Sequence, residues 1–448
     1  MKTPVSDFIE KYAKSGFSRF HMPGHKGKGP VGLEKYDITE IDGADVLSEA
    51  TGIIGESENN LTSLYKSGKS FFITQGSTTA ICAMLALIKN DAGDKTYVLV
   101  ARNVHKAFVY AAALLDFDIQ WLWPEGEMNS LCSCQISKEM VEKTLESLRE
   151  KGIVPAAVYL TSPDYLGQRQ DIKGIVEVCH KFGTLLTVDN AHGAYLHFVE
   201  DPIHPMDLGA DMCSDSAHKT LPVLTGGAYL QISKNMPEEV KKSAKSAMAL
   251  FGSTSPSYLT MISLDKCNEY LAGNYRKELH EMVKRVETLK EELENLGWNV
   301  TLGEPLKMTV QMPDKLSGSE YSKHLRKFQV ECEYADPDFI VFMFTANNVE
   351  EDLQRIKEAF GKNVYKYENS HKLIPAKCEK VLSIRNAIFA PHEEIPVTEA
   401  MGRICASPAV SCPPAIPIVI SGEKIDENAI NLFGYYSISN VDVVLEMC

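Results

Sequence analysis

The chain has 448 residues and a formal charge of −14, with 46 Lys and Arg against 60 Asp and Glu. This acidity argues against a nucleic-acid-binding protein, which usually presents a basic face. Hydrophobic residues make up 44% and charged residues 24%, which excludes a disordered or coiled-coil chain as a whole. The length exceeds the ~100–150 residues of a typical domain, so we expect at least two domains.

Membrane and export signals are not apparent in the sequence. The longest uncharged apolar runs, around residues 80–88 and 107–115, are shorter than the ~20 residues that cross a bilayer. The N-terminal residues lack the apolar stretch of a signal peptide. Eleven cysteines in such a chain indicate reduced thiols and a cytoplasmic location. We expect the one close pair, Cys132 and Cys134, in a surface loop rather than in a metal or redox site.

An N-terminal segment of residues 1–50, irregular and rich in Gly, Pro and His, precedes a regular alternation of strands and helices. The expected strands are 70–74, 97–100, 155–160, 184–188 and 210–213, and the expected helices are 80–88, 107–115, 172–182 and 275–296. Each strand is almost continuously apolar, as expected when helices cover both faces of a sheet. The alternation predicts an α/β fold with a mostly parallel sheet flanked by helices.

From about residue 300 the alternation begins again on a smaller scale. The expected strands there are 307–312 and 339–344, and the expected helices are 320–328 and 349–360. We therefore predict a large domain over residues 51–298 and a smaller C-terminal α/β domain over residues 299–448. The Pro-rich residues 411–417 cannot lie inside a helix and are expected to form an ordered loop.

Polar residues follow several expected strands, at the edge of an α/β sheet where ligands bind. After the strand at 70–74 come Gly76, Ser77 and Thr78, which open a helix. Glycine lets the backbone approach an anion, the hydroxyls can donate to it, and a helix N-terminus supplies N–H groups and partial positive charge. These residues are either a phosphate-binding cup or an ordinary helix cap.

Three further residues at strand ends complete a possible cofactor site. His105, Asp189 and Lys219 each follow an expected strand, and each alone has a plain interpretation as a solvated or capping side chain. Together with the phosphate cup they match the needs of pyridoxal 5′-phosphate. An aromatic ring stacks on the pyridine, a carboxylate keeps its nitrogen protonated, and a lysine amine forms a Schiff base with its aldehyde.

At this point the sequence resembles a known family, the Orn/Lys/Arg decarboxylases. These belong to the fold-type-I PLP-dependent enzymes, which are aspartate-aminotransferase-like, and the similarity is to the short members of the family. The resemblance covers the chain nearly from end to end. The segments that carry it are FHMPGHKG at 20–27, DITEIDGADVL at 37–47, QGSTT at 75–79, ARNVHKAF at 101–108, TSPDYLG at 161–167, VDNAHGAY at 188–195, SAHKTLP at 216–222, STSPSYLTMISLD at 253–265 and the tail at 402–423.

The resemblance implies roles for individual residues. Lys219 would bind the cofactor aldehyde, Asp189 would pair with the pyridine nitrogen, His105 would stack on the ring, and Ala191 would pack behind it. The phosphate would be held by Gly76, Ser77, Thr78, Ser216 and His218. The loop at 253–258 would reach into the site of a partner subunit, so that Thr254 or Ser255 touches the phosphate there. The active unit would then be a homodimer.

The implied activity is decarboxylation of a small basic amino acid, namely arginine, lysine or ornithine, to CO₂ and an amine of the polyamine pathway. Lys219 or His218 would return a proton to Cα. Two alternatives remain open: a PLP-dependent aminotransferase or lyase acting on another amino acid, and a regulatory relative that binds the cofactor without turnover. We expect no metal, because neither His21 with His25 nor His192 with His197 has a third ligand in helical context.

Several positions depart from the family pattern in ways that concern the pocket wall. Asn190 stands where an acid is usual, Tyr195 where a His is usual, and Asp164 where a Thr is usual; the family's PPGIP is Pro-Pro-Ala-Ile-Pro at residues 413–417. Glu423 is expected to be either a surface residue or a contact for a cationic substrate. Arg403 is expected either to bind a carboxylate or to form a buried ion pair.

Overall fold

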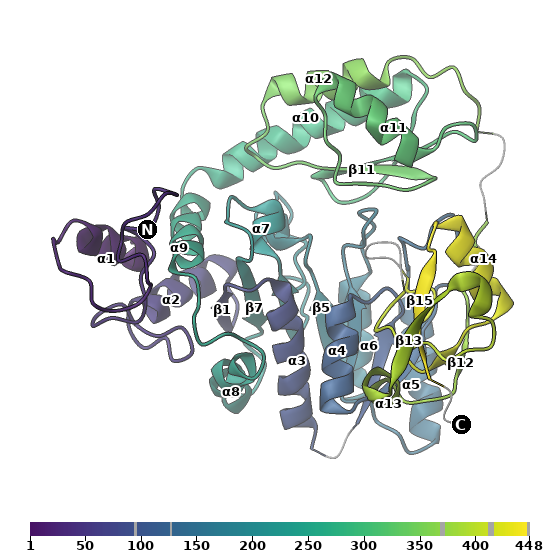
Figure 1. Ribbon diagram of the computed structural model, residues 1–448, viewed down its shortest axis with the longest axis horizontal. Helices are drawn as coiled ribbons and strands as arrows, with labels where there is room; N and C mark the ends of the chain where they lie inside the picture. Colours follow the sequence, from purple (N-terminus) through teal and green to yellow (C-terminus); the bar gives the residue numbers. More distant parts are fainter. Residues whose placement is uncertain (94–95, 126–127, 368–371, 411–415, 446–448) are drawn as a thin grey trace. The chain divides into compact units, whose positions relative to one another are not determined.

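The computed structural model describes residues 1–93, 96–125, 128–367, 372–410 and 416–445. It contains two compact units (Figure 1). The first comprises Met1–Gly93 and Leu185–His280, and the second comprises Asp94–Thr184 and Glu281–Cys448. The division into domains at residues 50 and 298 stays a prediction.

The first unit contains helices on both sides of four strands (Figure 1). Its elements are α1 (Pro4–Ala13), α2 (Ile53–Tyr65), β1 (Lys69–Ile73), α3 (Ser77–Ala92), β5 (Leu185–Asp189), η1 (Ala194–His197), β6 (Met212–Asp215), α7 (Ala217–Thr220), β7 (Ala228–Ile232), α8 (Glu238–Ala249), α9 (Tyr258–Ala272) and the start of α10 (Tyr275–Asn295). The strand order is β1-β7-β6-β5. Helix α3 contacts β6 and β7 on one side and α8 on the other.

Strand direction in the first unit decides which chain segments meet. β5 and β6 are parallel, and β7 is antiparallel to both β6 and β1. The carboxyl ends of β1, β5 and β6 therefore lie at one edge, together with the start of β7. The segments that follow these three strands carry Gly76, Asp189 and Lys219, so the topology gathers them at a single edge as α/β sheets do for ligand sites.

The second unit contains three parallel strands and three smaller sheets. Its elements are β2 (Tyr97–Ala101), α4 (Lys106–Leu115), β3 (Asp118–Leu122), α5 (Lys138–Glu150), β4 (Ala157–Thr161), α6 (Ile172–Lys181), the rest of α10, β8 (Asn299–Thr301), β9 (Lys307–Gln311), α11 (Gly318–Leu325), η2 (Arg326–Phe328), β10 (Tyr334–Ala335), β11 (Phe339–Met343), α12 (Glu350–Phe360), β12 (Glu379–Lys380), α13 (Ile384–Phe389), β13 (His392–Pro396), η3 (Val397–Glu399), β14 (Glu423–Lys424), α14 (Glu427–Tyr435) and β15 (Asn440–Val444).

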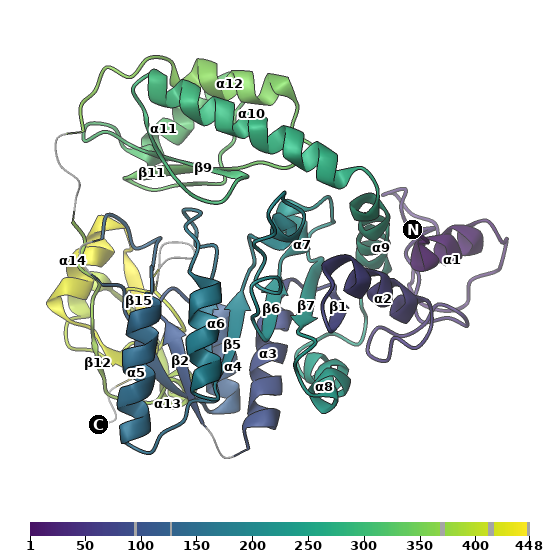
Figure 2. The same ribbon diagram turned by 180° about the vertical axis from the view of Figure 1, so that it is seen from behind.

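In the second unit, parallel strand pairs and antiparallel strand pairs occur in different groups of strands. β4, β2 and β3 are parallel neighbours, and α5 and α6 lie side by side along them (Figure 2). β10, β11, β9 and β8 form an antiparallel sheet, with α10, α11 and α12 on one side of it in both ribbon views (Figures 1 and 2). Two antiparallel pairs, β12 with β14 and β13 with β15, complete the C-terminal part.

The structure confirms the α/β fold with a large, mainly parallel sheet flanked by helices. Every strand and helix expected from the apolar pattern is present, with ends displaced by a few residues. The expectation for residues 411–417 falls mostly on residues 411–415, which lie outside the described residues. Among the described residues, no helix combines the length and apolar character needed to cross a bilayer.

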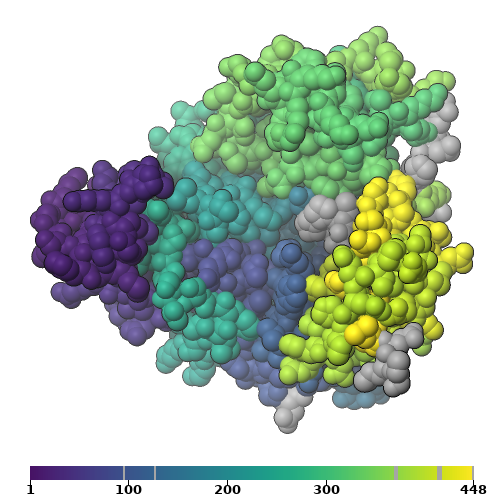
Figure 3. Space-filling view, in the orientation of Figure 1, coloured from purple at the N-terminus to yellow at the C-terminus, as the bar shows by residue number. Residues whose placement is uncertain are grey.

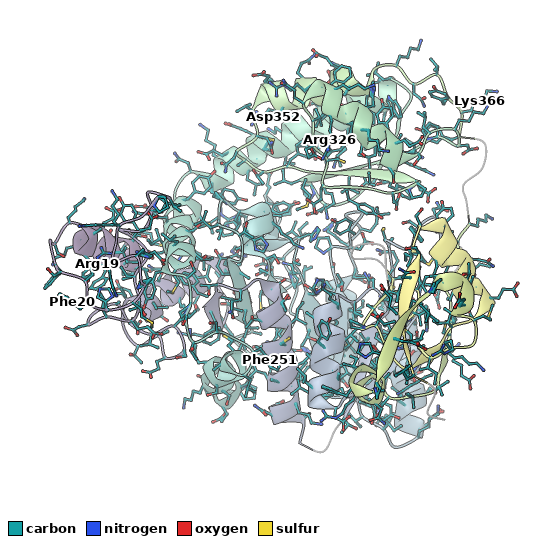
Figure 4. All side chains as sticks on the ribbon, viewed as in Figure 1. Arg19, Phe20, Phe251, Arg326, Asp352 and Lys366 are labelled. Atoms are coloured by element: carbon teal, nitrogen blue, oxygen red, sulfur yellow. The ribbon has the colours of Figure 1, made fainter. Side chains whose placement is uncertain are left out.

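The N-terminal segment is less irregular than expected. Residues Pro4–Ala13 form α1, whose buried Val5 and Ile9 join a core cluster with Tyr258 and Met261 of α9. After α1 the segment is irregular and lies at the surface (Figure 3). Phe20, labelled with Arg19 in Figure 4, is 92% exposed.

The expectation that Cys132 and Cys134 lie in a surface loop is only partly correct. Both lie in a loop, but they are 1% and 0% exposed and therefore belong to the core rather than the surface. Burial raises the pKa of the Cys134 thiol to about 12, so this group is a small core side chain at neutral pH.

Candidate active site

The N-terminus of α3 has the geometry of an anion site. Gly76 precedes the helix with φ +76°, a conformation that favours glycine, and a Cβ there would meet nothing within 4 Å. Its amide donates to the carbonyl of Gly226 at 2.7 Å, which ties the turn to the start of β7. The Ser216 hydroxyl donates to the Ser77 hydroxyl at 2.8 Å. Together with Thr78 in the first helical turn, these groups present hydroxyls beside the amides of a 16-residue helix.

Asp189 is the last residue of β5 and is only 2% exposed. Its Oδ1 accepts from the Ser214 hydroxyl at 3.1 Å and from the amide of Ala191 at 3.2 Å. Ser214 is also the partner of Asp189 in the register of β5 and β6. A buried carboxylate is costly unless it meets donors or positive charge. The position and chemistry of this group suit a cationic nitrogen.

Lys219 lies on the short helix α7, directly after β6, and its amine is 3.0 Å from Nε2 of His192. His192 follows β5 in a tight turn, where the amide of Gly193 donates to the carbonyl of Asn190 at 2.8 Å. A Cβ at Gly193 would lie 2.0 Å from Oδ1 of Asn190, so a larger residue there would force the Asn190 side chain to move. The turn thus brings an imidazole to the amine of the candidate Schiff-base lysine.

His192 is the residue whose part in the site the sequence reasoning missed. It was considered only as one of two possible metal ligands with His197. Its position three residues after Asp189, in a segment that follows a parallel strand, was the available signal. His197 instead contacts Asp207, with Nδ1 2.8 Å from Oδ2.

His218, the neighbour of Lys219, is oriented by the backbone of β7. Its Nδ1 is 2.9 Å from the carbonyl oxygen of Gly227, and its own amide donates to the same oxygen at 3.0 Å. Both bonds fix His218 between α7 and the start of β7. A role for His218 in phosphate binding or proton transfer stays a prediction.

The loop at 253–258 approaches the α3 N-terminus of its own chain. The amide of Ser253 donates to Oε1 of Gln75 at 2.9 Å, and the amide of Ser255 donates to the Ser253 hydroxyl. Thr254, Gln75 and Thr79 line a cavity of about 250 Å³. Contact of Thr254 or Ser255 with the phosphate of a second subunit stays a prediction.

His105 belongs to the second unit, where it caps α4 directly after β2. Its Nδ1 accepts from the amide of Ala107 at 3.2 Å. Stacking of its ring on a cofactor stays a prediction.

Glu423 is buried rather than at the surface. It is 4% exposed, and its two carboxylate oxygens each accept from a different terminal nitrogen of Arg102 at 2.7 Å. The surface expectation for Glu423 was wrong, because its charge is matched in the interior by Arg102, 321 positions away in the sequence. Contact with a cationic substrate stays a prediction. Arg403 is ion-paired with Glu393 at 2.9 Å, but the pair is partly exposed rather than buried.

Asp164, one of the departures from the family pattern, is buried and holds a turn together. It accepts from the Ser133 hydroxyl at 2.6 Å and from the amides of Leu166 and Gln168. Burial outweighs these bonds and raises the pKa of this carboxyl to about 6.

Asn190 and Tyr195, the other departures, are also buried. The Asn190 amide donates to buried Asp215 at 2.6 Å, and Asp215 also contacts His204 at 3.0 Å. An acid at position 190 would place two carboxylates in contact, so asparagine suits Asp215 there.

His204, Cys213 and Asp215 place donor atoms within 4.8 Å of one another, which is the spacing of a metal site. However, Nδ1 of His204 accepts the amide proton of Met206, so Nε2 carries the proton that it donates to Asp215. Burial raises the pKa of the Cys213 thiol well above its usual range. His204 and Asp215 belong to a hydrogen-bond network that also includes Asn190 and Gln231.

Comparisons with known proteins identify the family of the chain. The model of the Orn/Lys/Arg decarboxylase major domain matches residues 3–384, and that of the C-terminal domain matches residues 362–441. An arginine decarboxylase of Bacillus subtilis is 28% identical over 99% of this chain and 94% of its own. The constitutive lysine decarboxylase of Escherichia coli is 23% identical over 67% of this chain and 46% of its own.

Solved structures share the fold. A lysine decarboxylase of Francisella novicida superposes with a TM-score of 0.80 at 17% identity, over 99% of this chain and 81% of its own. Lysine decarboxylase A of Pseudomonas aeruginosa gives 0.81 at 16% identity, over 99% and 80%. The two family models together span the chain almost completely, and the chain therefore belongs to the Orn/Lys/Arg decarboxylase family.

Proposed function

We propose that this protein is a pyridoxal 5′-phosphate-dependent decarboxylase that removes the α-carboxylate of arginine, lysine or ornithine as CO₂. The observation that carries the proposal is the amine of Lys219 held 3.0 Å from His192, at the sheet edge where buried Asp189 ends β5. Family membership supplies the reaction class.

The residues present fit the cofactor. The hydroxyls of Ser77 and Ser216 and the amides that open α3 are the donors that a phosphate requires. The open space at Gly76 lets an anion approach the backbone. A buried carboxylate at Asp189 suits a protonated ring nitrogen, and Lys219 is the amine for the aldehyde carbon.

Each residue then has a distinct task. When bound, the cofactor supplies an electron sink for the bond between Cα and the carboxylate. Asp189 holds the proton on the ring nitrogen and so maintains that sink. Lys219 would hold the aldehyde carbon of the cofactor, and its amine could carry a proton for the reacting carbon of the substrate. His192, at 3.0 Å from this amine, can exchange a proton with it.

Arginine is the first substrate to test. The relatives named arginine decarboxylase are 27–28% identical to this chain, whereas the constitutive and inducible lysine decarboxylases of Escherichia coli are 23% and 20% identical. The acidic net charge is compatible with a cationic substrate but does not select among the three. The product would be an amine of the polyamine pathway.

The test is a panel of amino acids incubated with the purified protein and the cofactor, read for CO₂, amine and keto acid together. Release of CO₂ with stoichiometric amine from arginine, lysine or ornithine is the expected result. Keto acid without CO₂ would establish the aminotransferase alternative instead. Cofactor binding without any product from the panel would establish a regulatory relative and overturn the proposal.

We also propose that the enzyme is a cytoplasmic homodimer. All nine described cysteines carry thiols, which suits a reducing compartment. Exposed apolar side chains, among them Phe17, Phe20 and Met22, occur in the N-terminal segment within or beside a family motif, as expected of a surface covered by a second subunit. Light scattering at micromolar concentration should give twice the 49.7 kDa chain mass, and the mass of one chain would contradict the dimer.

A further inference from the structure

A buried ion pair in the second unit connects the C-terminal part of the chain to the loop that carries His105. Arg102 has no exposed surface, and its two terminal nitrogens each donate to one oxygen of Glu423 at 2.7 Å. The guanidinium also lies over the rings of Trp121 at 4.8 Å and Trp123 at 4.6 Å. Two of the three tryptophans in the chain thus enclose this one cation.

Glu423 is held as firmly as its partner. Its Oε2 also accepts from the amide of Ile420 at 2.9 Å. Gly422 before it has φ +90°, and a Cβ there would lie 2.4 Å from the carbonyl oxygen of Leu382, so the turn requires glycine. The backbone of Glu423 pairs with β12 and with Cys405. The carboxylate is therefore positioned before it meets Arg102.

Arg102 in turn belongs to the short loop between β2 and α4. Its amide donates to the carbonyl of Leu122, and its carbonyl accepts from the amide of Val104 at 3.0 Å. The carbonyl of Asn103 accepts from the Thr161 hydroxyl at 2.8 Å. His105 follows as the cap of α4. Each end of this four-residue loop is thus held by hydrogen bonds, and Glu423 adds a charged partner from a distant part of the sequence.

A buried ion pair is weak evidence for stability, because desolvation of both charges opposes their attraction, but it specifies one arrangement of the chain. We propose that Arg102 and Glu423 are positioning residues that fix loop 102–105, and through it His105, against the C-terminal segment. The part assigned to His105 as the ring that stacks on the cofactor rests on the proposed function. The part assigned to the loop does not.

The first test uses the protein without cofactor. Glu423→Gln removes the charge with little change of shape, and hydrogen exchange of residues 101–108 should become about tenfold faster or more. The matched control is Glu331→Gln, which breaks the exposed pair with Arg326 (labelled in Figure 4), joined at 2.8 Å. This control should leave exchange of 101–108 unchanged. Unchanged exchange in a folded Glu423→Gln variant would overturn the proposal.

If Glu423→Gln lacks the far-ultraviolet circular dichroism of the folded chain, Glu423→Asp replaces it, because the charge is kept and only its reach is shortened. The same faster exchange of 101–108 is expected, to a smaller degree. A folded Glu423→Asp variant with wild-type exchange would contradict the proposal equally.

The second test asks whether the pair acts through His105. Glu423→Gln should weaken pyridoxal 5′-phosphate binding at least about fivefold in the wild-type background and less than about twofold in His105→Ala. Equal losses in both backgrounds would mean a general structural effect and would overturn the action through His105. Failure of the wild-type protein to bind the cofactor would refute the proposed function, while the exchange measurement would still decide the role of the pair in the loop.

Discussion

Polar residues follow parallel strands in both units, but their partners differ. In the first unit Asp189 is met by the Ser214 hydroxyl and a backbone amide, and Lys219 is met by the His192 imidazole. In the second unit Arg102 is matched by a full opposite charge and enclosed by two indole rings. Arg102 and Glu423 meet each other's charge directly and so specify one arrangement of the chain, whereas Asp189 and Lys219 lie at the sheet edge where α/β folds bind ligands.

The largest effect is expected for Lys219→Ala. Loss of the amine should remove the visible absorbance of the bound cofactor and lower the decarboxylation rate by roughly 10³-fold or more, as removal of a catalytic nucleophile does. Spectra and rates with arginine, lysine and ornithine measure both effects. Lys241→Ala, which removes an amine from a pair with Glu238 on α8, is the matched control and should retain both. A Lys219→Ala variant with a normal visible band would refute the assignment.

Asp189→Ala should retain the cofactor weakly and turn over slowly. An adjacent carboxylate raises the pKa of a cationic partner by about 1–3 units, so its loss should leave the ring nitrogen mostly unprotonated and reduce the rate roughly 10- to 1000-fold. Titration of the cofactor and kcat measure the two parts. Near-normal turnover would mean that Asp189 has a structural role and does not act on the cofactor.

Arg102→Met should act on stability. It leaves the Glu423 carboxylate buried without its cation, which typically costs about 3–5 kcal/mol. The exposed pair of Arg326 and Glu331 provides the matched comparison, since Arg326→Met should cost no more than about 1 kcal/mol. Urea denaturation gives both values. Equally small losses of stability in the two variants would mean that burial does not make the Arg102 pair more important for stability than the Arg326 pair.

The smallest effect concerns pH and Asp164, whose pKa is raised by burial from its ordinary 3.8 to about 6. The folded state therefore binds this proton more tightly than the unfolded state. Its contribution to stability is fully present below about pH 4 and is lost as the pH rises to about 6, by at most about 3 kcal/mol. Asp164→Asn should flatten this part of the profile, measured by denaturation between pH 4 and pH 7. An unchanged slope would contradict the raised pKa.

Asp336→Asn is the companion measurement, since burial raises the pKa of Asp336 to about 6 as well. Each single variant should remove part of the pH dependence of the free energy of unfolding. The double variant should remove more of it than either single variant. A double variant with the wild-type slope would mean that other groups dominate.

The spacing of apolar residues along the sequence predicted the strands and helices well, because it follows which face of each element is buried. The strand over 184–188 and the helix over 275–296 appear within two residues of their expected ends. Helix α1 was missed although Val5, Phe8, Ile9 and Tyr12 have helical spacing, because the Gly- and Pro-rich residues after it dominated the interpretation. The antiparallel entry of β7 between β1 and β6 has no local signal, since the pairing of β7 with β1 joins residues that are far apart in the sequence, such as Lys69 and Ile232.

In the candidate site, too, the sequence pattern indicated some residues and not others. Gly76, Ser77, Asp189 and Lys219 could be selected because each follows an apolar strand. The contact of His192 with Lys219 required the turn at Gly193, which only the structure reveals. Glu423 was misjudged because its burial depends on Arg102, a partner that no local pattern indicates.

The most direct test of the central claim is borohydride reduction of the protein loaded with pyridoxal 5′-phosphate, followed by peptide mass spectrometry. Reduction makes the bond between the cofactor and its lysine permanent. We expect the cofactor mass on Lys219. Prior incubation with the preferred basic amino acid should lower this labelling. Stoichiometric labelling of another lysine, with Lys219 unmodified, would contradict this expectation.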